Sequence, residues 1–366
     1  MPGARDVDDA VRRARLVVGL GDPDVTWSVL LRLRLARPVD RAGLEQRLAV
    51  MLAAFPHLGR VAGVVATTRQ DEELVLCDFA DRTYGDRDPL LRVALAEDGR
   101  SLLLGCHHGV VDGLGMLGVA SRLLGVEVTS DARGRADESA GGFVGRAAAR
   151  LVAATVRPPA RLHAGSPDGE SSGDHLRAIG GSALSVSSAT LVLAAARLVG
   201  SWNAGRRART GRVSIAVGIS RRPGRPVPPP DRETGLVMVQ AADGVRDLLA
   251  ARRLLAQTTP EPAYPARDGH TLAPSLVSRL QARVAATIGI SNLGRISGDG
   301  VERADFWPVA AGPTGIALGL ASTSGSTALT TRVPRRWFGA EDTDRLTGDA
   351  WAELQALAGS DLALGQ

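Results

Sequence analysis

Alternating apolar and polar residues predict a half-buried strand near the start of the chain. From Trp27 to Leu35 every second side chain is apolar, and Ser28, Arg32 and Arg34 lie between them. Successive side chains on a strand point to opposite faces, so this pattern places one face in a core and leaves the other polar. Pro38 then ends the strand, because proline cannot donate a backbone hydrogen bond.

A helical period follows directly. Asp40 can cap a helix, and the apolar positions after it repeat every three or four residues, at Leu44, Leu48, Met51 and Leu52. Residues with this spacing lie on one face of a helix. The segment after Asp40 is therefore predicted to be a helix packed on the first strand.

The remaining elements of the first half are shorter. Pro89–Ala96 and Ser101–Cys106 are predicted strands around an Asp98-Gly99 turn, and the second is apolar throughout, as a buried strand is. Shorter strands are predicted at 61–66 and 73–77, and helices at 114–124 and 147–156.

A segment rich in proline, glycine and serine divides the chain. We predict a first lobe at 1–157, a linker at 158–178 and a second lobe at 179–366. In the second lobe a helix starts at Ser187 or Ser188, strands are predicted at 212–220, 236–240, 286–290, 315–322 and 327–332, and a closing helix carries Leu346, Trp351, Leu354 and Leu357. Both lobes mix strands and helices without strict alternation, which predicts the α+β class.

Composition and charge exclude some classes of partner. Of 366 residues, 44% are hydrophobic. The net charge of +5 is the difference between 44 basic residues, which are all arginine, and 39 acidic residues. The arginines are scattered and only 3% of residues are aromatic, so the chain lacks the stacking platform of a nucleic-acid-binding protein.

Two cysteines, Cys77 and Cys106, form no disulfide framework, and we expect a cytoplasmic protein. No signal peptide is evident in Met1–Gly21 and no stretch is long enough to span a membrane.

Candidate chemistry is concentrated at the end of the buried strand, where residues 107–113 read His-His-Gly-Val-Val-Asp-Gly. A neutral imidazole can accept and return a proton near neutral pH. Adjacent strand residues point to opposite faces, so one of His107 and His108 is expected to face a cavity and the other to pack inward. Asp112 can fix the backbone or an arginine, and Gly113 leaves room for a ligand or backbone. The other histidines are interpreted as structural: His57, His163, His175 and His270.

The pattern His-His-x-x-x-Asp-Gly at a strand end resembles the active-site region of condensation domains and CoA-dependent acyltransferases. The segment Ile290-Ser291-Asn292-Leu293-Gly294 is similar to one in the free-standing polyketide-associated and alcohol O-acyltransferase branch. The resemblance implies two lobes, each like a chloramphenicol acetyltransferase subunit, that form a V-shaped pseudo-dimer with a central tunnel.

The same resemblance implies roles for individual residues. His108 is then the general base and His107 is structural. Asp112 pairs with an arginine of the second lobe, for which Arg221 is the candidate. Ser291 and Asn292 lie near the tunnel as substrate-binding residues.

The implied reaction is the transfer of an acyl group from a CoA or carrier-protein phosphopantetheine thioester to a hydroxyl or amine. The partners are a small-molecule acceptor and, as a candidate, an acyl or peptidyl carrier protein. No permanently bound cofactor is implied, and no further ligands at suitable spacing indicate a metal at the histidine pair. The motif Asp-Phe-Gly-Trp-Gly of peptide-forming condensation domains is absent, which favours ester formation.

Three alternatives stay open. The same base could serve cyclisation or elimination on a bound intermediate. The chain could also be a non-catalytic platform that binds a carrier protein. Cys106, two residues before His108, is either a small buried apolar residue or a Cys-His nucleophile, and the first reading is favoured.

Overall fold

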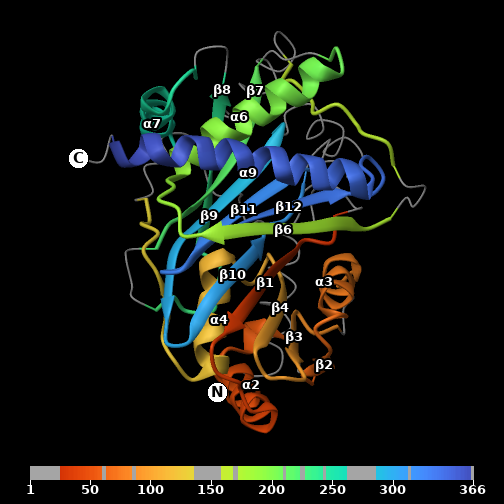
Figure 1. Cartoon of the computed structure of the whole chain (residues 1–366). Coiled ribbons are helices and arrows are strands. Elements are labelled where there is room, and N and C mark those ends of the chain that lie inside the picture. The colour runs from red at the N-terminus through yellow and green to blue at the C-terminus, as the bar shows by residue number, and fades with distance from the viewer. Residues whose placement is uncertain are drawn as a thin grey trace, which may run out of the picture.

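A computed structural model of the chain describes residues 25–59, 63–84, 88–135, 158–167, 172–208, 212–222, 227–241, 245–261, 286–311 and 315–363. Figure 1 shows these ranges as two β-sheets with helices packed on them. The strands are β1 (Ser28–Leu35), β2 (Val65–Thr67), β3 (Leu91–Ala96), β4 (Ser101–His107), β5 (Val128–Ser130), β6 (Asp174–Ser182), β7 (Val213–Ser220), β8 (Thr234–Ala241), β9 (Ile288–Gly298), β10 (Val301–Trp307), β11 (Ala317–Ser322) and β12 (Ser326–Pro334). The helices are α2 (Arg41–Ala54), α3 (Glu72–Asp81), α4 (Gly113–Leu124), α6 (Ser188–Gly205), α7 (Leu248–Gln257) and α9 (Ala340–Ala363), with a short 3₁₀ turn at Pro56–Leu58.

The first half of the chain supplies most strands of one sheet, and the second half supplies most strands of the other. In the described ranges the first sheet has the order β10-β1-β4-β3-β2 and the second has the order β6-β12-β11-β9-β7-β8, with β5 paired to β9. Both sheets are mixed. In the first sheet β2 runs parallel to β3, and in the second sheet β9 runs parallel to β7 and β11, while the hairpins are antiparallel. The predicted α+β class is confirmed. The lobe boundaries at 1–157, 158–178 and 179–366 stay a prediction.

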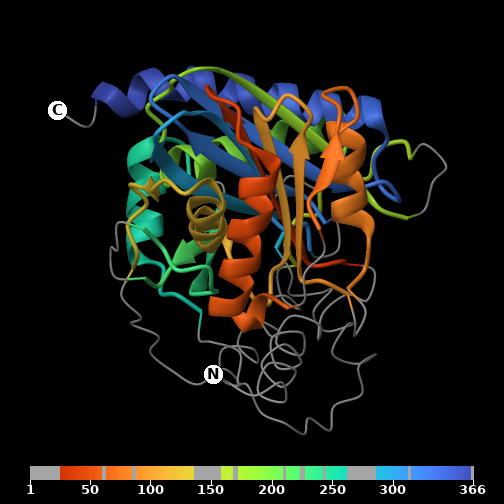
Figure 2. The same cartoon turned by 90° about the horizontal axis from the view of Figure 1, so that it is seen from below.

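The first sheet shows how the sequence pattern becomes packing. Asp40 caps α2 by accepting a hydrogen bond from the Gly43 N–H at 2.7 Å, and the four predicted apolar residues of this helix are buried. Leu31 and its odd-numbered neighbours face α2 and α4, whereas Leu30 belongs to a cluster with Leu76 and Phe79 of α3. Figure 2 shows α2 and α4 on the near side of the strands of this sheet. Both faces of β1 are therefore covered, and the prediction of a half-buried strand was wrong.

The strand predicted at 73–77 was also wrong, because this segment lies within α3. Its buried residues recur at helical spacing, at Glu72, Leu76, Phe79 and Ala80. Two glutamates in the first turn also favour a helix, since they complement the positive end of the helix dipole. The helix predicted at 147–156 lies outside the described residues.

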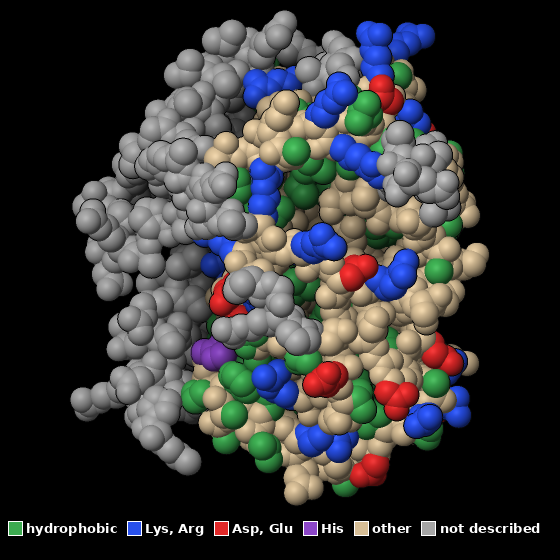
Figure 3. All heavy atoms as spheres, turned by 90° about the vertical axis from the view of Figure 1, so that its left-hand side faces the viewer, with side chains coloured by type: hydrophobic (Ala, Val, Ile, Leu, Met, Phe, Trp, Pro, Cys, Tyr) green, Lys and Arg blue, Asp and Glu red, His purple; other side chains and the backbone are tan. Residues whose placement is uncertain are grey.

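The second sheet has its own core. Helix α9 runs across it and packs on α6 (Figure 1), and the predicted Leu346, Trp351, Leu354 and Leu357 are buried in that core. No helix in the described ranges combines the length and hydrophobicity needed to cross a membrane. On the face drawn in Figure 3 the arginines lie among acidic side chains rather than in one continuous patch.

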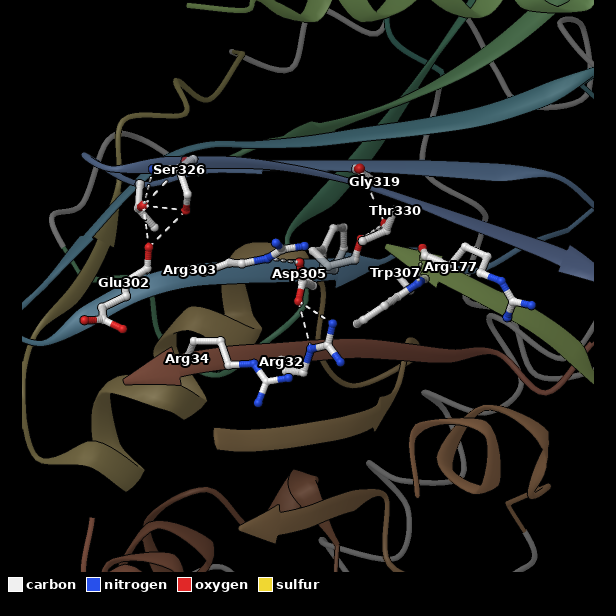
Figure 4. Close-up of polar contacts among 12 residues, drawn as sticks. Arg32, Arg34, Arg177, Glu302, Arg303, Asp305, Trp307, Gly319, Ser326 and Thr330 are labelled. Carbon is white, nitrogen blue, oxygen red and sulfur yellow. Dashed lines mark hydrogen bonds and ion pairs between the residues drawn. The ribbon is translucent and has the colours of Figure 1, made fainter. Parts of the chain in front are cut away.

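Strand β10 comes from the second half of the chain but completes the first sheet by pairing with β1. Figure 4 shows its polar contacts on both sides. Toward β1, the Asp305 carboxylate accepts from the Arg32 Nε at 2.8 Å. Its other oxygen accepts from the Nε of Arg303, on β10 itself, at 2.8 Å. Toward β6, the Trp307 indole N–H donates to the Arg177 carbonyl at 3.0 Å. Strand β10 thus ties the two sheets together.

We expect Asp305→Ala to lower the free energy of unfolding by about 3–5 kcal/mol. Asp305 is fully buried. Its loss leaves the buried Arg32 guanidinium with Glu72, at 3.7 Å, as its one ion-pair partner among the described residues. Denaturant unfolding measures the change. The matched control is Asp299→Ala, which removes an exposed carboxylate paired with Arg37 at 3.6 Å and should cost less than about 1 kcal/mol. Equal effects of the two variants would contradict a structural role for the Asp305 cluster.

Candidate functional site

The corner between β4 and α4 positions the histidine pair. Strand β4 ends at His107 and α4 begins at Gly113. The His108 N–H donates to the Trp27 carbonyl at 2.7 Å, just before β1 begins. Asp112 is the N-cap of α4 and accepts from the Gly115 N–H at 2.7 Å. The backbone around His108 is therefore fixed from both sides by the strand and the helix.

The two histidines point to opposite sides, as the strand pattern predicts. His107 is 5% exposed, and its ring meets the Tyr84 ring edge-on at a centroid distance of 5.0 Å. His108 lines a cavity of about 1180 Å³ whose walls come from both halves of the chain. The His108 Nδ1 lies 3.3 Å from the Val111 carbonyl oxygen. A carbonyl can only accept, so this contact places the hydrogen on Nδ1 and leaves Nε2 as the basic nitrogen.

The surroundings of His108 favour its neutral form. Burial lowers its pKa to about 4, with the positive charge of Arg232 adding to the effect. The negative charge of Asp112 and the contact with the Val111 carbonyl act in the opposite direction. With this pKa the imidazole is neutral, and able to accept a proton, throughout the range above about pH 4.

Asp112 is saturated with hydrogen-bond donors. One oxygen accepts from the Arg222 guanidinium and the Gly115 N–H, each at 2.7 Å. The other oxygen accepts from the Glu233 N–H at 2.7 Å and the Thr234 hydroxyl at 2.9 Å. A carboxylate held by four donors is suited to positioning rather than to proton transfer. It joins the start of α4 to the 231–234 segment of the other half.

The arginine that pairs with Asp112 is Arg222, so the prediction of Arg221 was wrong by one position. Arg222 is 4% exposed and its second terminal nitrogen donates to the Asp231 carbonyl at 2.7 Å. Arg221 instead continues the strand pairing, and its guanidinium donates to the Glu261 carbonyl at 2.8 Å. Neighbouring residues at a strand end point in different directions, so a shift of one residue selects the other side chain. The predicted cross-half ion pair itself is present.

Glycines in α4 allow close packing. A Cβ on Gly113 would lie 2.6 Å from Leu293 Cδ2 and 2.9 Å from Phe306 Cζ. A Cβ on Gly115 would lie 2.2 Å from the Asp231 carbonyl oxygen. Protein atoms therefore fill the space that Gly113 leaves, although this residue also lines the cavity. The glycines let the second half approach the helix that follows the histidines.

Ser291 and Asn292 lie in the same cavity as His108. Both belong to β9, where Ser291 is opposite Gly218 of the neighbouring strand. The Asn292 amide oxygen accepts from the Gly294 N–H at 2.8 Å, which fixes the turn of the backbone there. The structure thus brings Ser291 and Asn292 together with His108, and their contact with substrate stays a prediction.

Two further residues, Cys106 and Arg232, bear on the chemistry of the site. Cys106 is fully buried and burial raises the pKa of its thiol, which favours the apolar interpretation over a nucleophile. Arg232 lines the cavity and its charge acts on His108, yet sequence reasoning missed it, because nothing distinguishes it from the other arginines. Among the described residues no cluster of three or more histidine, cysteine or acidic side chains is arranged to hold a metal.

Comparisons with known proteins place this geometry in a known fold. No protein-family model and no curated protein sequence matches the chain. Solved structures do match. The starter condensation domain of rhizomide synthetase, in complex with C8-CoA, is 13% identical with a TM-score of 0.61, over 96% of this chain and 94% of that chain. The first condensation domain of the calcium-dependent antibiotic synthetase, with a substrate analogue, is 17% identical with a TM-score of 0.61, over 96% and 95%.

An epimerization domain has the same architecture. That of the third module of tyrocidine synthetase B is 14% identical with a TM-score of 0.53, over 93% of each chain. At these identities the likeness concerns the fold. The chain has the condensation-domain fold, with two sheets in chloramphenicol-acetyltransferase-like lobes, as the resemblance implied. The V shape and the central tunnel stay predictions.

Proposed function

We propose that this chain, with its condensation-domain fold, is an acyltransferase that uses His108 as general base. It moves an acyl group from a CoA or carrier-protein thioester to a hydroxyl or amine of a small acceptor. One observation carries the proposal: His108 presents a neutral imidazole, with Nε2 as its basic nitrogen, to a cavity lined by both halves of the chain.

The reaction follows from this geometry. His108 Nε2 accepts a proton from the acceptor oxygen or nitrogen as that atom attacks the thioester carbonyl. A new carbon–oxygen or carbon–nitrogen bond forms and gives a tetrahedral intermediate. Its collapse breaks the carbon–sulfur bond, and the proton passes from His108 to the departing thiolate. His107 and Asp112 position the base, while Ser291 and Asn292 contact the substrate.

The choice of donor is supported by a ligand that is bound to another protein of this fold. A structural neighbour was solved with C8-CoA, which supports an acyl-CoA as co-substrate in place of a permanently bound cofactor. An acyl or peptidyl carrier protein is the alternative donor, and the cytoplasm is the expected location. Ser291-Asn292-Leu293-Gly294, in place of the motif of peptide-forming domains, favours the free-standing ester-forming branch.

A second candidate is cyclisation or elimination on a bound intermediate. It is supported by the occurrence of the same fold in a domain named for cyclization and in one named for epimerization, reactions other than acyl transfer to a separate acceptor. His108 would serve this chemistry as well. The two candidates differ in one product, because only acyl transfer releases a thiol from the donor.

We therefore expect the purified protein to release free thiol from an acyl-CoA in an acceptor-dependent way. The experiment supplies short, medium and long acyl-CoAs with alcohols and amines, and follows free CoA over time for the wild type and His108→Ala. Release that requires both acceptor and His108 supports the proposal. If CoA donors give no release, the matching carrier-bound thioesters are tested. Absence of release from those too would overturn acyl transfer and favour cyclisation, elimination or a non-catalytic platform.

A further inference from the structure

Arg232 is a cation on the wall of the cavity. Its side chain is exposed to the cavity, and among the described residues no hydrogen bond or ion pair reaches its guanidinium. Its neighbour Arg222, in contrast, is buried and paired with both Asp112 and Asp231. An arginine stays charged under all ordinary conditions. A permanent positive charge is therefore available to a ligand in the cavity.

The backbone that carries Arg232 is held on both sides. The Asp231 carbonyl accepts from the Asp112 N–H at 3.3 Å and from Arg222 at 2.7 Å. The Glu233 N–H donates to the Asp112 carboxylate at 2.7 Å, and its carbonyl accepts from the Arg221 N–H at 2.8 Å. Asp112 is also the helix cap next to the histidine pair. The same cluster thus fixes the backbone beside both His108 and Arg232.

The positive charge of Arg232 makes His108 a weaker base unless a bound anion neutralises that charge. The charged groups that act on His108 are Arg232 and Asp112, and Arg222 already neutralises Asp112. The Arg232 charge, added to burial, lowers the pKa of His108 and so weakens it as a proton acceptor. General bases work best when their pKa is close to the operating pH. A bound anion would cancel the Arg232 charge and strengthen the base when substrate is present.

We propose that Arg232 binds a carboxylate on the acceptor, so that the acceptor is a small hydroxy or amino acid. This inference rests on the proposed function, because it names the acceptor class of that same site. Arginine suits the role, since its planar guanidinium matches a carboxylate with two parallel hydrogen bonds. The acid group then orients the attacking hydroxyl or amine toward His108.

The donor is a poorer source for the anion. When the thioester carbonyl stands at His108, the long pantetheine arm holds the CoA phosphates far from the base. The anion beside His108 must therefore belong to a group close to the reacting atoms. A carboxylate next to the hydroxyl or amine of the acceptor meets this condition.

The first test is an NMR titration of the histidines, which needs no acyl transfer. The His108 signal is assigned by its loss in His108→Ala, and its pKa is measured with and without acetate or lactate. We expect these carboxylates to raise the His108 pKa from about 4 toward the ordinary value of 6.5. In Arg232→Gln the pKa should be raised already and not respond, whereas Arg232→Lys should keep the response. Arg295→Gln, which removes another arginine of the cavity wall, should behave like the wild type. A His108 pKa that ignores carboxylates, or that responds to inorganic phosphate alone, would overturn the proposal.

The second test compares acceptors that differ in charge alone. Lactate and alanine are paired with lactamide and alaninamide in the thiol-release assay. We expect Arg232→Gln to raise the KM for the two acids by about 10- to 100-fold, the loss of one charge-assisted contact, and to leave the KM for the two amides unchanged. Equal use of acids and amides by the wild type would refute the carboxylate role. If no thiol is released but the NMR response persists, the anion site stands and only the acyl-transfer function fails.

Discussion

Replacing His108 with alanine should lower acceptor-dependent thiol release by about 10²- to 10⁴-fold, the usual contribution of a general base. The side chain lines the cavity, and its Nδ1 faces the Val111 carbonyl at 3.3 Å, so Nε2 is the nitrogen that can take a proton. The loss should appear in kcat, because an imidazole that acts in the transition state contributes little to binding the ground state. Steady-state kinetics of the purified variant measure the effect.

The pH dependence of the wild type adds a second expectation. Burial and the Arg232 charge lower the pKa of His108 to about 4. Protonation removes the base, so kcat/KM should be level from pH 6 upward and fall only as the pH drops toward about 4. A profile that falls near 6.5, the ordinary value for histidine, would show that the base is less buried than described or is a different histidine.

The control for this variant is His163→Ala, which removes an exposed imidazole outside the cavity lining. It should retain the activity and the pH profile of the wild type. Circular dichroism and denaturant unfolding would confirm that both variants fold. Full activity in folded His108→Ala would reject His108 as the base.

The sequence predicted the local structure of residues 107–113 better than the path of the chain around them. Strand alternation in 107–113 predicted that one histidine faces a cavity, because it is a local property, and the resemblance to condensation domains assigned that position to His108. The partner of Asp112 was predicted as the wrong one of two adjacent arginines, since the turn after β7 depends on contacts with the other half. Arg232 could not be predicted, because its role arises from the packing of a distant loop against α4.

The missed elements have a similar cause. Strand β10 contains Glu302, Arg303 and Asp305, so its sequence looks polar, yet Asp305 is fully buried between two arginines. Hydrophobic periodicity cannot identify a strand whose buried positions hold paired charges. The error at residues 73–77 has a different origin, because an element was recognised there but was assigned to the wrong type. A short apolar run fits a strand or a helix equally well, and it becomes α3 because its buried residues cover the second face of β1.

The second large effect is expected at Asp112. Asp112→Ala should lower the free energy of unfolding by about 3–5 kcal/mol, because it leaves the buried Arg222 guanidinium without its buried partner. The same change removes the N-cap of α4 and two of the contacts that hold the 231–234 segment. Denaturant unfolding measures the loss of stability, and the assay should show activity falling as well, since both His108 and Arg232 depend on this cluster for their positions.

A double-mutant cycle separates the ion pair from the other contacts of Asp112. Arg222→Met alone should also destabilise, since it leaves the buried carboxylate unpaired. Combined with Asp112→Ala, it removes both charges, and the double variant should be less destabilised than the sum of the single variants, with a coupling of about 1–3 kcal/mol. Glu341→Ala, which breaks an exposed pair with Arg345 at 3.3 Å, serves as a surface control and should change stability by less than about 1 kcal/mol. Strict additivity of Asp112→Ala and Arg222→Met would mean that the two charges do not stabilise each other. The contact between the halves would then depend on the hydrogen bonds from Glu233 and Thr234 instead.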